Sequence, residues 1–447
     1  MKGAINMNSK YNFGTGKPCS CGKIHTTSVR EGIIKKGAVG ELARCVRNFG
    51  SKRAFLFGDI NTYPIAGDRV CELLEKEGLS VSKYIFKDKH LEPDEAAVGS
   101  IVMNYDAKCD IIIAIGSGVI NDIGKILSTL TGNPYIIIAT APSMDGYGSA
   151  SSSMARDGIK VTLPTKSPEI VIGDIDILKT APVHMAKSGL GDMLAKYVSI
   201  CEWRLSQVIT GEYYCEEIAA YIRESLKKCV DNAKGLLNGD EKSIEAVFEG
   251  LLASGIAMDY AGLSRPASGG EHYLSHIWDM RGLAFGTPVD LHGIQCGIGT
   301  RYVIRGYEAL RKITPDRDKA LKYAESFDFS VWSDELRKFI GKGAEAMIKL
   351  EEREQKYDLE LHRARLDGII ENRDRIIEII NEELPTIEEF ENTLKLIEAP
   401  MRAAEIGIDE DILPMCLKAT KDFRDKYVLS RLLWDLGVLD EVCAEIF

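Results

Sequence analysis

Residues 109–125 read CDIIIAIGSGVINDIGK, and this stretch decides the fold of the first part of the chain. Ile111 to Ile115 form an unbroken apolar run, which is typical of a strand covered on both faces. Gly116 and Gly118 end the run, and apolar residues then recur at helical spacing. Glycine lets backbone amides approach a ligand, and a helix start presents unpaired N–H groups to a phosphate. From these residues alone, a phosphate cradle and a plain tight turn are both open.

The surrounding sequence repeats the same alternation of strand and helix. Apolar runs at residues 54–57, 81–86 and 135–139 predict strands, with helical patterns between them. This alternation predicts right-handed crossovers and a parallel sheet whose ligands lie at the carboxyl ends of the strands. Small residues and short β-rich runs at 145–177 predict a loop followed by a hairpin or an extra strand at the edge of the sheet.

After Pro182 the sequence changes to long amphipathic helical patterns. A chain of 447 residues exceeds what one core usually supports, so we expect two domains. We predict an α/β, Rossmann-like domain with a parallel sheet at residues 1–180 and an all-helical, metal- and substrate-binding domain at 181–447. We place the boundary near residues 178–182.

Residues 341–384 are highly charged within this helical part. Gly368 is the candidate break between two helices there, and Thr386 with Glu389 has the pattern of a capping box that opens the next helix. We interpret the charged region as a solvated helical surface, with a partner-binding or oligomer surface as the alternative.

Charge and composition exclude some classes of partner. The net charge is −11 without a long basic run, which argues against nucleic acid or an anionic membrane as the main partner. No apolar segment approaches the roughly 20 uncharged residues of a membrane span, and residues 1–16 lack a signal-peptide core. We therefore expect a cytoplasmic protein.

The chain has 11 cysteines, and most lie in apolar or helical segments, which predicts reduced thiols. One cluster differs, namely Cys19, Cys21 and His25 in KPCSCGKIHTT. A small metal knuckle is one interpretation, but it has too few close ligands for a complete tetrahedral site. A glycine turn between two strands is the interpretation we favour.

The helical part contains residues that could bind a catalytic metal. His272 and His276 are four residues apart in GGEHYLSHIWDM, which places both imidazoles on one helix face, and His292 follows in VDLHGIQCGIGT. Two imidazoles and a carboxylate leave a divalent metal with open positions, as a catalytic site requires. The spacing does not decide which of His272 and His276 is the ligand.

Three aspartates could supply the carboxylate: Asp192, Asp145 and Asp290. Asp192 lies in KSGLGDMLAKYVS, where two glycines precede a helical pattern, and we expect it in an early helical turn. An aspartate there most often stabilises the helix dipole. Spacing alone does not choose among the three.

The motifs together resemble a known family. In chain order they are GSGVINDIGK, TAPSMDGYGSASS, GLGDMLAKY, GGEHYLSH and LHGIQCGIGT, with the CSCGKIH start and the closing KYVLSRLLWDLGVLDE. This order resembles the metal-dependent glycerol-1-phosphate dehydrogenases, especially their bacterial branch. They belong to the superfamily of glycerol dehydrogenase, iron-containing alcohol dehydrogenase and dehydroquinate synthase, so the resemblance implies a dehydroquinate synthase-like fold. Residues 341–384 are the part of the chain that aligns least well with this family.

The resemblance assigns roles to individual residues. It implies Asp192, His272 and His292 as metal ligands, and His276 and Asp145 as catalytic residues on the substrate side. It implies a set of cofactor-binding residues: Asp59, Gly116, Ser117, Gly118, Val119, Ile120, Asp122, Lys125, Thr140, Ser143 and Ser149. Ser117 departs from the three successive glycines usual in the family, and its Cβ could crowd a pyrophosphate or its hydroxyl could donate to it.

The implied reaction is hydride transfer between NAD or NADP and dihydroxyacetone phosphate, giving sn-glycerol 1-phosphate for phospholipid metabolism. Asp59 should repel a 2′-phosphate and favours NAD, although Lys52 and Arg53 weaken that preference. Zinc and nickel both suit the ligands. We expect a homo-oligomer, with a homodimer favoured.

Arg265, Arg281 and Arg301 are possible partners of the substrate phosphate, although a surface ion pair is the more common role of each. The nearest alternative function is a glycerol dehydrogenase or another polyol or alcohol dehydrogenase of the same superfamily. Dehydroquinate synthase usually has a glutamate where this chain has Asp192. A non-catalytic protein on the same fold is the remaining alternative.

Overall fold

The computed structural model describes residues 16–447, and the first fifteen residues, where we expect no signal-peptide core, lie outside the described part. Residues 16–157, 161–193 and 217–263 group into one compact unit, here the sheet unit. Residues 158–160, 194–216 and 264–447 group into a second, here the helical unit. This grouping differs from the predicted domains at 1–180 and 181–447, because residues 181–193 and 217–263 belong to the sheet unit.

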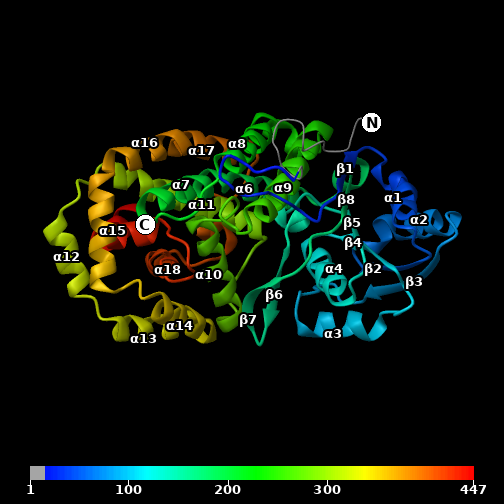
Figure 1. The fold of residues 1–447 in the computed structure, drawn as a ribbon, viewed down its shortest axis with the longest axis horizontal. Coiled ribbons are helices and arrows are strands. Elements are labelled where there is room, and N and C mark those ends of the chain that lie inside the picture. The colour runs from blue at the N-terminus through cyan, green and yellow to red at the C-terminus, as the bar shows by residue number, and fades with distance from the viewer. Residues whose placement is uncertain (1–15) are drawn as a thin grey trace. The chain divides into compact units, whose positions relative to one another are not determined.

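The sheet unit contains a six-stranded parallel sheet (Figure 1). Its strand order is β1-β8-β5-β4-β2-β3, and a separate hairpin joins β6 to β7. The strands are β1 (Glu31–Lys35), β2 (Arg53–Asp59), β3 (Ser80–Phe86), β4 (Ile111–Gly116), β5 (Tyr135–Ala139), β6 (Ser151–Arg156), β7 (Ile159–Pro164) and β8 (Ile170–Asp174). The predicted α/β architecture with a parallel sheet is confirmed.

The hairpin predicted within residues 145–177 is confirmed as β6 and β7, but two other local predictions about this sheet were wrong. The extra strand after the hairpin, β8, is interior and pairs with both β1 and β5. Its residues are all buried, which is the pattern of a strand covered on both faces. Residues 16–30 contain no strand, so the glycine turn around Cys19 and Cys21 does not join two strands.

Alternate residues of the strands fill two cores. Ile113 and Ile115 of β4 and Ile136 and Ile138 of β5 belong to a cluster with the buried residues of α1 and α2. On the other face, a Cβ at Gly124 of α4 would lie 2.4 Å from the Tyr135 ring, so α4 packs closely there. The apolar runs of the sequence therefore mark strands with helices on both sides.

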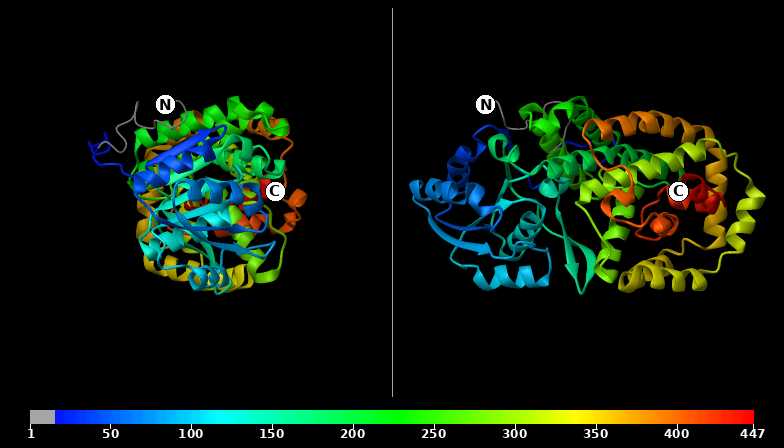
Figure 2. Two further views of the ribbon diagram at one scale, coloured as in Figure 1. Left: turned by 90° about the vertical axis from the view of Figure 1, so that its right-hand side faces the viewer. Right: turned by 180° about the vertical axis from the view of Figure 1, so that it is seen from behind.

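The helices of the sheet unit surround the sheet, and Figures 1 and 2 both show α1 and α2, in blue, side by side. The α-helices are α1 (Leu42–Phe49), α2 (Tyr63–Lys76), α3 (Glu95–Asn104), α4 (Gly118–Thr131), α5 (Ile175–Leu178), α6 (Val183–Leu194), α8 (Glu216–Asp231) and α9 (Glu241–Ala261). Short 3-10 helices are η1 (Ala38–Glu41), η2 (Asp145–Gly148) and η3 (Ala233–Asn238).

The helical unit is built almost wholly from helices, as predicted. They are α7 (Lys196–Thr210), α10 (Gly270–Phe285), α11 (His292–Arg311), α12 (Arg317–Glu325), α13 (Phe329–Ile340), η4 (Gly341–Gly343), α14 (Ala344–Glu354), α15 (Leu359–Glu371), α16 (Arg373–Glu383), α17 (Ile387–Leu396), η5 (Ala403–Ile406), η6 (Glu410–Ile412), α18 (Leu413–Thr420), α19 (Leu429–Asp435) and α20 (Leu439–Ile446).

Two predictions concern the ends of helices in this unit. The capping box at Thr386 is confirmed, with the Thr386 hydroxyl accepting from the Glu389 amide and the Glu389 carboxylate accepting from the Thr386 amide. The break expected at Gly368 was wrong, because α15 continues through Gly368 and ends before Asn372. The Asn372 side chain donates to the Gly368 carbonyl at 2.8 Å and so satisfies one of the carbonyls at the end of the helix.

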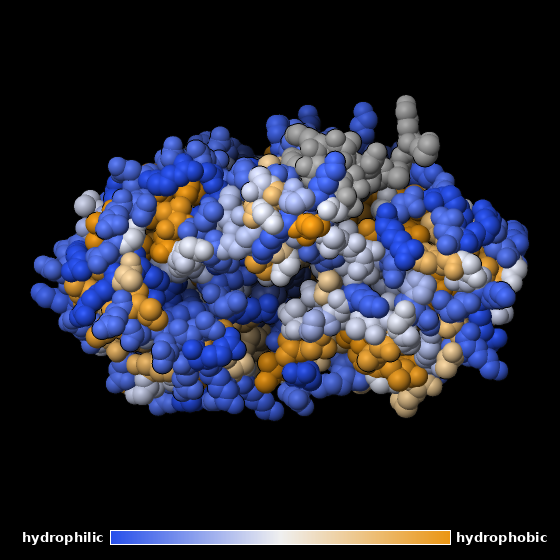
Figure 3. Space-filling view, in the orientation of Figure 1, coloured by the Kyte–Doolittle hydropathy of each residue, from blue (hydrophilic) through white to orange (hydrophobic). Residues whose placement is uncertain are grey.

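The surface is mostly polar on the face that Figure 3 shows, and the helices of the described residues are not of a membrane-spanning kind. Within residues 16–447, no helix is both long enough and apolar enough to cross a lipid bilayer. The face drawn in Figure 3 is mostly hydrophilic with scattered apolar groups. Exposed apolar side chains such as Met103, at 81% exposure, are ordinary on a protein surface when they are isolated.

Gly116 should be required by packing within the sheet unit. A Cβ there would lie 2.4 Å from the Ile120 Cβ, so Gly116→Ala should lower the free energy of unfolding by about 1–3 kcal/mol. Gly99→Ala is the matched control, because a Cβ at this helical glycine meets nothing within 4 Å. Chemical denaturation of both variants checks this, and equal stability of the two would contradict the packing argument.

Candidate functional site

Two buried carboxylates hold the start of α10 in the helical unit. The Gly269 amide donates to Glu271 Oε1 at 2.8 Å, and the Gly270 amide donates to Glu202 Oε2 at 2.7 Å. A Cβ at Gly269 would lie 2.5 Å from Glu202 Oε2, so the glycine pair of GGEH makes room for this carboxylate. Burial, together with the charge of Glu271, raises the pKa of Glu202 to about 8.

His272 is oriented by its neighbour on the same helix. Its Nδ1 lies 2.6 Å from Glu271 Oε1, and the imidazole is buried. A histidine whose Nδ1–H is held by a carboxylate presents Nε2 to a metal, and this arrangement fixes both its tautomer and its ring orientation.

His292 begins α11 and lies beside His272. The two ring centroids are 5.0 Å apart, and His292 Nδ1 lies 3.2 Å from Ser275 Oγ. The Cys296 sulfur is 3.5 Å from His292 Nε2. One ligand atom from each of His272, His292 and Cys296 lies within 4.8 Å of the others. Two imidazoles and a thiol are donors that suit zinc or nickel, so this set fits a divalent transition metal.

Cys296 was not among the residues singled out in the sequence. Its signal is the four-residue step from His292 in LHGIQC, which places both side chains on one helix face. Burial raises the pKa of the Cys296 thiol, but His272 and His292 outweigh burial, and the net pKa is lowered.

His276 lies one helical turn beyond His272. Its ring stacks on Phe423 and on His292, with centroids 5.4 Å apart in each case. Among the described residues, its Nδ1 has no hydrogen-bond partner, and the nearest carboxylate oxygen, on Asp279, is 4.0 Å away. Burial, with the positive charges of Lys160 and Arg424, holds the pKa of His276 well below its ordinary value. The imidazole is therefore neutral.

Lys160 and Arg424 are the basic side chains near these histidines. Lys160 forms an ion pair with Asp279, and the Arg424 guanidinium lies 5.3 Å from the centroid of the Phe423 ring. The three arginines considered from the sequence have other partners: Arg265 pairs with Glu212, Arg281 donates to the Phe339 carbonyl and Arg301 pairs with Glu391. Arg265 is also buried and not on the surface.

Asp192 belongs to the sheet unit and lies in the last turn of α6, so its expected place in an early turn was wrong. The helix already includes Gly189, where a Cβ would come within 2.0 Å of the Pro142 carbonyl oxygen. Both glycines of GLGD therefore lie inside the helix and do not precede it, and Gly189 permits close packing there. The buried Asp192 carboxylate accepts from the Asp145 amide at 2.9 Å, and Asp145 accepts from Ser254 Oγ at 2.8 Å.

The predicted phosphate turn joins β4 to α4. Gly116 ends the strand, Ser117 is the N-cap residue without a side-chain capping bond, and Gly118 begins the helix. A Cβ at Gly118 would come no closer than 3.5 Å to Met144, an ordinary contact. Packing therefore requires glycine at 116 and not at 118, which leaves close approach of a ligand as a reason for Gly118.

Lys125 has a structural role in this region. It is fully buried, pairs with Asp122 at 2.8 Å and donates to the Gly146 carbonyl at 3.1 Å. Its Nζ also lies 3.4 Å from Ser149 Oγ. The amine therefore holds the segment that contains Gly146 and Ser149 against α4.

The remaining predicted cofactor residues lie around the same strand ends. Val119 and Ile120 are in the first turn of α4. The Thr140 amide donates to the Gly116 carbonyl at 3.1 Å, and the Ser143 carbonyl accepts from Ser188. Asp59 ends β2, and its Oδ1 accepts from the amides of Asn61 and Thr62, each at 2.8 Å. Their contacts with a cofactor stay predictions.

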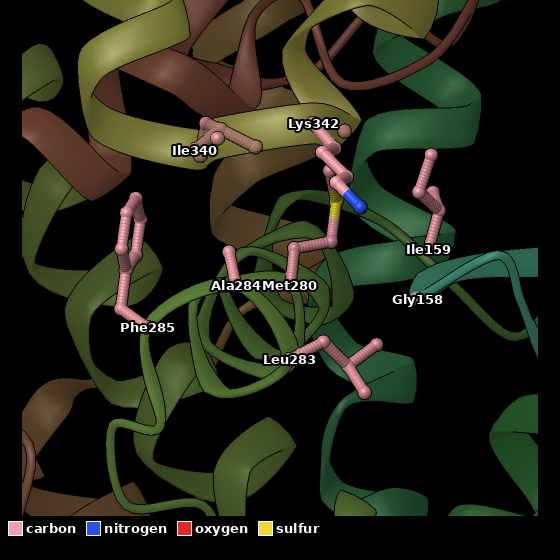
Figure 4. Close-up of a pocket in the computed structure, with 10 residues that line it drawn as sticks. Gly158, Ile159, Met280, Leu283, Ala284, Phe285, Ile340 and Lys342 are labelled. Carbon is pink, nitrogen blue, oxygen red and sulfur yellow. The ribbon is translucent and has the colours of Figure 1, made fainter.

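A cavity of about 250 Å³ lies beside the second half of α10 (Figure 4). It is lined mainly by apolar side chains, including Met280, Leu283 and Ile340, with Lys342 at its edge. Figure 4 shows the Lys342 and Met280 side chains pointing toward one another. None of His272, His276 and His292 lines this cavity, so it is separate from the histidine cluster.

The chain is similar in sequence to known dehydrogenases. Residues 33–182 match the family model described as iron-containing alcohol dehydrogenase. The chain is 35% identical to a glycerol-1-phosphate dehydrogenase [NAD(P)+] from Halalkalibacterium halodurans, covering 66% of this chain and 75% of that protein. It is 36% identical to a protein of the same name from Pyrococcus horikoshii, covering 61% and 76% respectively.

Solved structures give the same fold at lower identity. A 1,3-propanediol oxidoreductase superposes with a TM-score of 0.61 at 13% identity, covering 94% of this chain and 98% of that one. A glycerol dehydrogenase from Schizosaccharomyces pombe superposes with a TM-score of 0.57 at 17% identity, covering 94% and 91%. At these identities the likeness establishes the fold alone.

Glu271 should control the metal affinity of the histidine pair. Glu271→Gln removes the charge that orients His272 while keeping the size of the side chain, so we expect metal affinity to fall by about 10- to 100-fold. Competition with a chromogenic chelator measures the affinity. Glu249→Gln, which removes a carboxylate paired with Lys228 in the sheet unit, should leave it unchanged. Equal affinity in the Glu271 variant would contradict the orienting role.

Proposed function

Because the chain belongs to the glycerol-1-phosphate dehydrogenase family, we propose that it is a metal-dependent, NAD(P)-linked oxidoreductase that reduces dihydroxyacetone phosphate to sn-glycerol 1-phosphate. The observation that carries the proposal is the pairing of His272 and His292, with His272 oriented by a buried carboxylate. A metal-binding pair on a family scaffold is what a carbonyl reduction of this kind needs.

His272 and His292 would hold the metal, and Asp192 would supply the carboxylate that the family motif assigns to it. The Asp192 carboxylate is buried, and the hydrogen bond that it accepts from the Asp145 amide at 2.9 Å holds it in a fixed orientation. A bound divalent ion would polarise the substrate carbonyl and stabilise the negative charge that develops on its oxygen. Cys296 is a further donor beside the two histidines.

His276 would orient the substrate and transfer the proton to the reduced oxygen. Its depressed pKa keeps the ring neutral, so one ring nitrogen carries a proton and the other accepts one. The stacking on Phe423 fixes the plane of the ring. A neutral imidazole in a fixed orientation can relay a proton, because it accepts one at one ring nitrogen as it gives one up from the other.

The substrate phosphate would bind Arg424, with Lys160 close by. Arg424 lies against the Phe423 ring, which stacks on His276. Lys160 pairs with Asp279, whose carboxylate is 4.0 Å from His276, so both basic groups lie near the proposed place of reaction. Arginine suits this role because its planar guanidinium can donate two hydrogen bonds to one phosphate. Lys160, which pairs with Asp279, is the secondary candidate because an ammonium group lacks the planar fork of a guanidinium.

The cofactor would bind the β4–α4 turn of the sheet unit. The amides at Gly118 and Val119 begin a helix and are suited to a pyrophosphate. Asp59 would favour NAD over NADP by repelling a 2′-phosphate. Its local hydrogen bonds to Asn61 and Thr62 hold the carboxylate at the carboxyl end of β2, where the ribose of a dinucleotide is expected.

Metal removal and substrate choice test the proposal together. The protein is treated with a chelator, reloaded separately with zinc or nickel and assayed for NADH and NADPH oxidation. Activity should disappear without metal, return with one of them and favour dihydroxyacetone phosphate over dihydroxyacetone. A preference for the unphosphorylated ketone would contradict the proposal and favour a glycerol dehydrogenase.

Two histidine variants separate binding from proton transfer. His292→Ala should lose the bound metal, measured by elemental analysis, while keeping NADH binding and helical circular dichroism. His276→Ala should keep the metal and lose about 100-fold or more in kcat. Loss of metal from the His276 variant, with retention in a His272→Ala variant, would show that the two histidines of α10 have the opposite roles.

Arg424 should be specific to the phosphorylated substrate. Arg424→Ala should raise KM for dihydroxyacetone phosphate about 10- to 100-fold, because charge-assisted hydrogen bonds are lost. Weak turnover of dihydroxyacetone should stay unchanged. Arg301→Ala is the matched control, since Arg301 already pairs with Glu391. An equal loss of activity with both ketones would contradict the assignment of Arg424 to the phosphate site.

A further inference from the structure

Cys19, Cys21 and His25 lie together in the loop that precedes β1, in the sheet unit. One ligand atom from each lies within 4.8 Å of the others, and Cys21 Sγ is 3.3 Å from His25 Nε2. These residues lie outside the functional site discussed above, and the sequence alone left their role open.

The loop is shaped to bring the two thiols to one side. Gly22 has a φ of +82°, a conformation that favours glycine, and its amide donates to the Cys19 carbonyl at 2.9 Å. The Cys19 amide in turn donates to the Lys23 carbonyl at 2.8 Å. These paired hydrogen bonds close a tight turn between Cys19 and Lys23, as the CSCGK sequence requires.

His25 is held with one nitrogen facing the thiols. Its Nδ1 lies 2.7 Å from the Tyr260 carbonyl oxygen, and the side chain is buried. A carbonyl only accepts, so Nδ1 carries the hydrogen, and in the neutral ring Nε2 presents a lone pair toward Cys21. Histidine ligands of metals are commonly fixed by such a bond to a backbone carbonyl.

The spacing of the donor atoms agrees with zinc. Zn–S and Zn–N bonds of about 2.3 and 2.1 Å at a tetrahedral angle put sulfur and nitrogen about 3.6 Å apart. The observed separation of 3.3 Å is close to this, although a thiol donating to an imidazole would give a similar value. What distinguishes a metal site is the third donor, Cys19, in the same small space.

A closed tetrahedral site needs a fourth ligand. Glu217, near the start of α8, accepts a hydrogen bond at its Oε1 from the amide of Ser20 at 3.2 Å. Ser20 lies between Cys19 and Cys21, so this bond connects α8 to the loop. Cys215 is buried and is joined to Glu217 through one residue, so the chain itself keeps their Cα atoms within about 7 Å of each other. Covalent linkage therefore makes this thiol the candidate.

We propose that Cys19, Cys21 and His25, with Cys215 as the fourth ligand, form a structural zinc site that fastens the N-terminal loop to the start of α8. Three thiolates and one imidazole leave zinc no open position, so the site stabilises the fold and takes no part in hydride transfer. This inference does not rest on the proposed function.

Metal counting on the full-length protein, purified without chelator, tests the site. Cys21→Ser and Cys215→Ser should each lose one zinc per chain while keeping the metal removed by His292→Ala. Both variants should keep kcat/KM within about twofold of the wild-type value at low temperature. Cys71→Ser, at a cysteine of similar exposure on α2, should lose no zinc. Unchanged zinc in Cys21→Ser would overturn the site, and unchanged zinc in Cys215→Ser would overturn the fourth ligand.

A measurement on the wild-type chain covers the case in which the variants fail to fold. Cys21 should resist alkylation by iodoacetamide in the zinc-loaded protein and react after mild chelation, as read by peptide mass spectrometry. Readdition of zinc should restore the protection. Equal alkylation of Cys21 with and without zinc would contradict the proposal.

Discussion

The carboxylates of Glu202 and Glu271 accept hydrogen bonds from the backbone amides at the start of α10, and the geometry of the histidine cluster depends on these bonds. Glu202 accepts hydrogen bonds from the Gly270 and Leu429 amides, and the Tyr307 hydroxyl lies 3.3 Å from the same carboxylate. These donors offset only part of the cost of burying one carboxylate near another, because the pKa of Glu202 is still raised to about 8 by burial and by the charge of Glu271. These hydrogen bonds fix the first turn of α10 and therefore the directions in which the side chains of His272 and His276 point.

Glycine serves different purposes in the two units. In the helical unit, the absence of a side chain at Gly269 lets the Glu202 carboxylate approach the backbone. In the sheet unit, Gly116, Gly124 and Gly189 permit close packing, whereas Gly118 is not required by its neighbours. Such a distinction matters for function, because a glycine that packing does not require is a place where a ligand can approach the backbone.

Much of the architecture could be predicted from the sequence because its signals are local. The isoleucine runs of β4 and β5 mark buried parallel strands, and the Thr386 capping box marks a helix start, since both depend on neighbouring residues. The interior position of β8 could not be predicted, because strand order depends on pairing across long separations. β1 was missed for a different reason, because EGIIK has only two strongly apolar residues between charged ones and so shows no apolar run.

The candidate site was predictable in its residue types and less so in its geometry. The spacing of His272 and His276 placed them on one face, but only the structure shows that Glu271 orients the first and that the second stacks on Phe423. Asp192 was misplaced within its helix because glycines normally signal helix ends, whereas Gly189 lies inside α6 and permits packing against Pro142. Cys296 was overlooked because cysteine in an apolar helix usually serves the core.

The central claim is that His272 and His292 bind one divalent metal on the face of α10 that the two carboxylates hold in place. Anomalous diffraction at the absorption edge of the loaded metal tests it most directly. The account predicts a peak about 2.0–2.1 Å from His272 Nε2 and from one ring nitrogen of His292. A peak bound by His276 and Asp279, with His272 left outside its coordination, would contradict it.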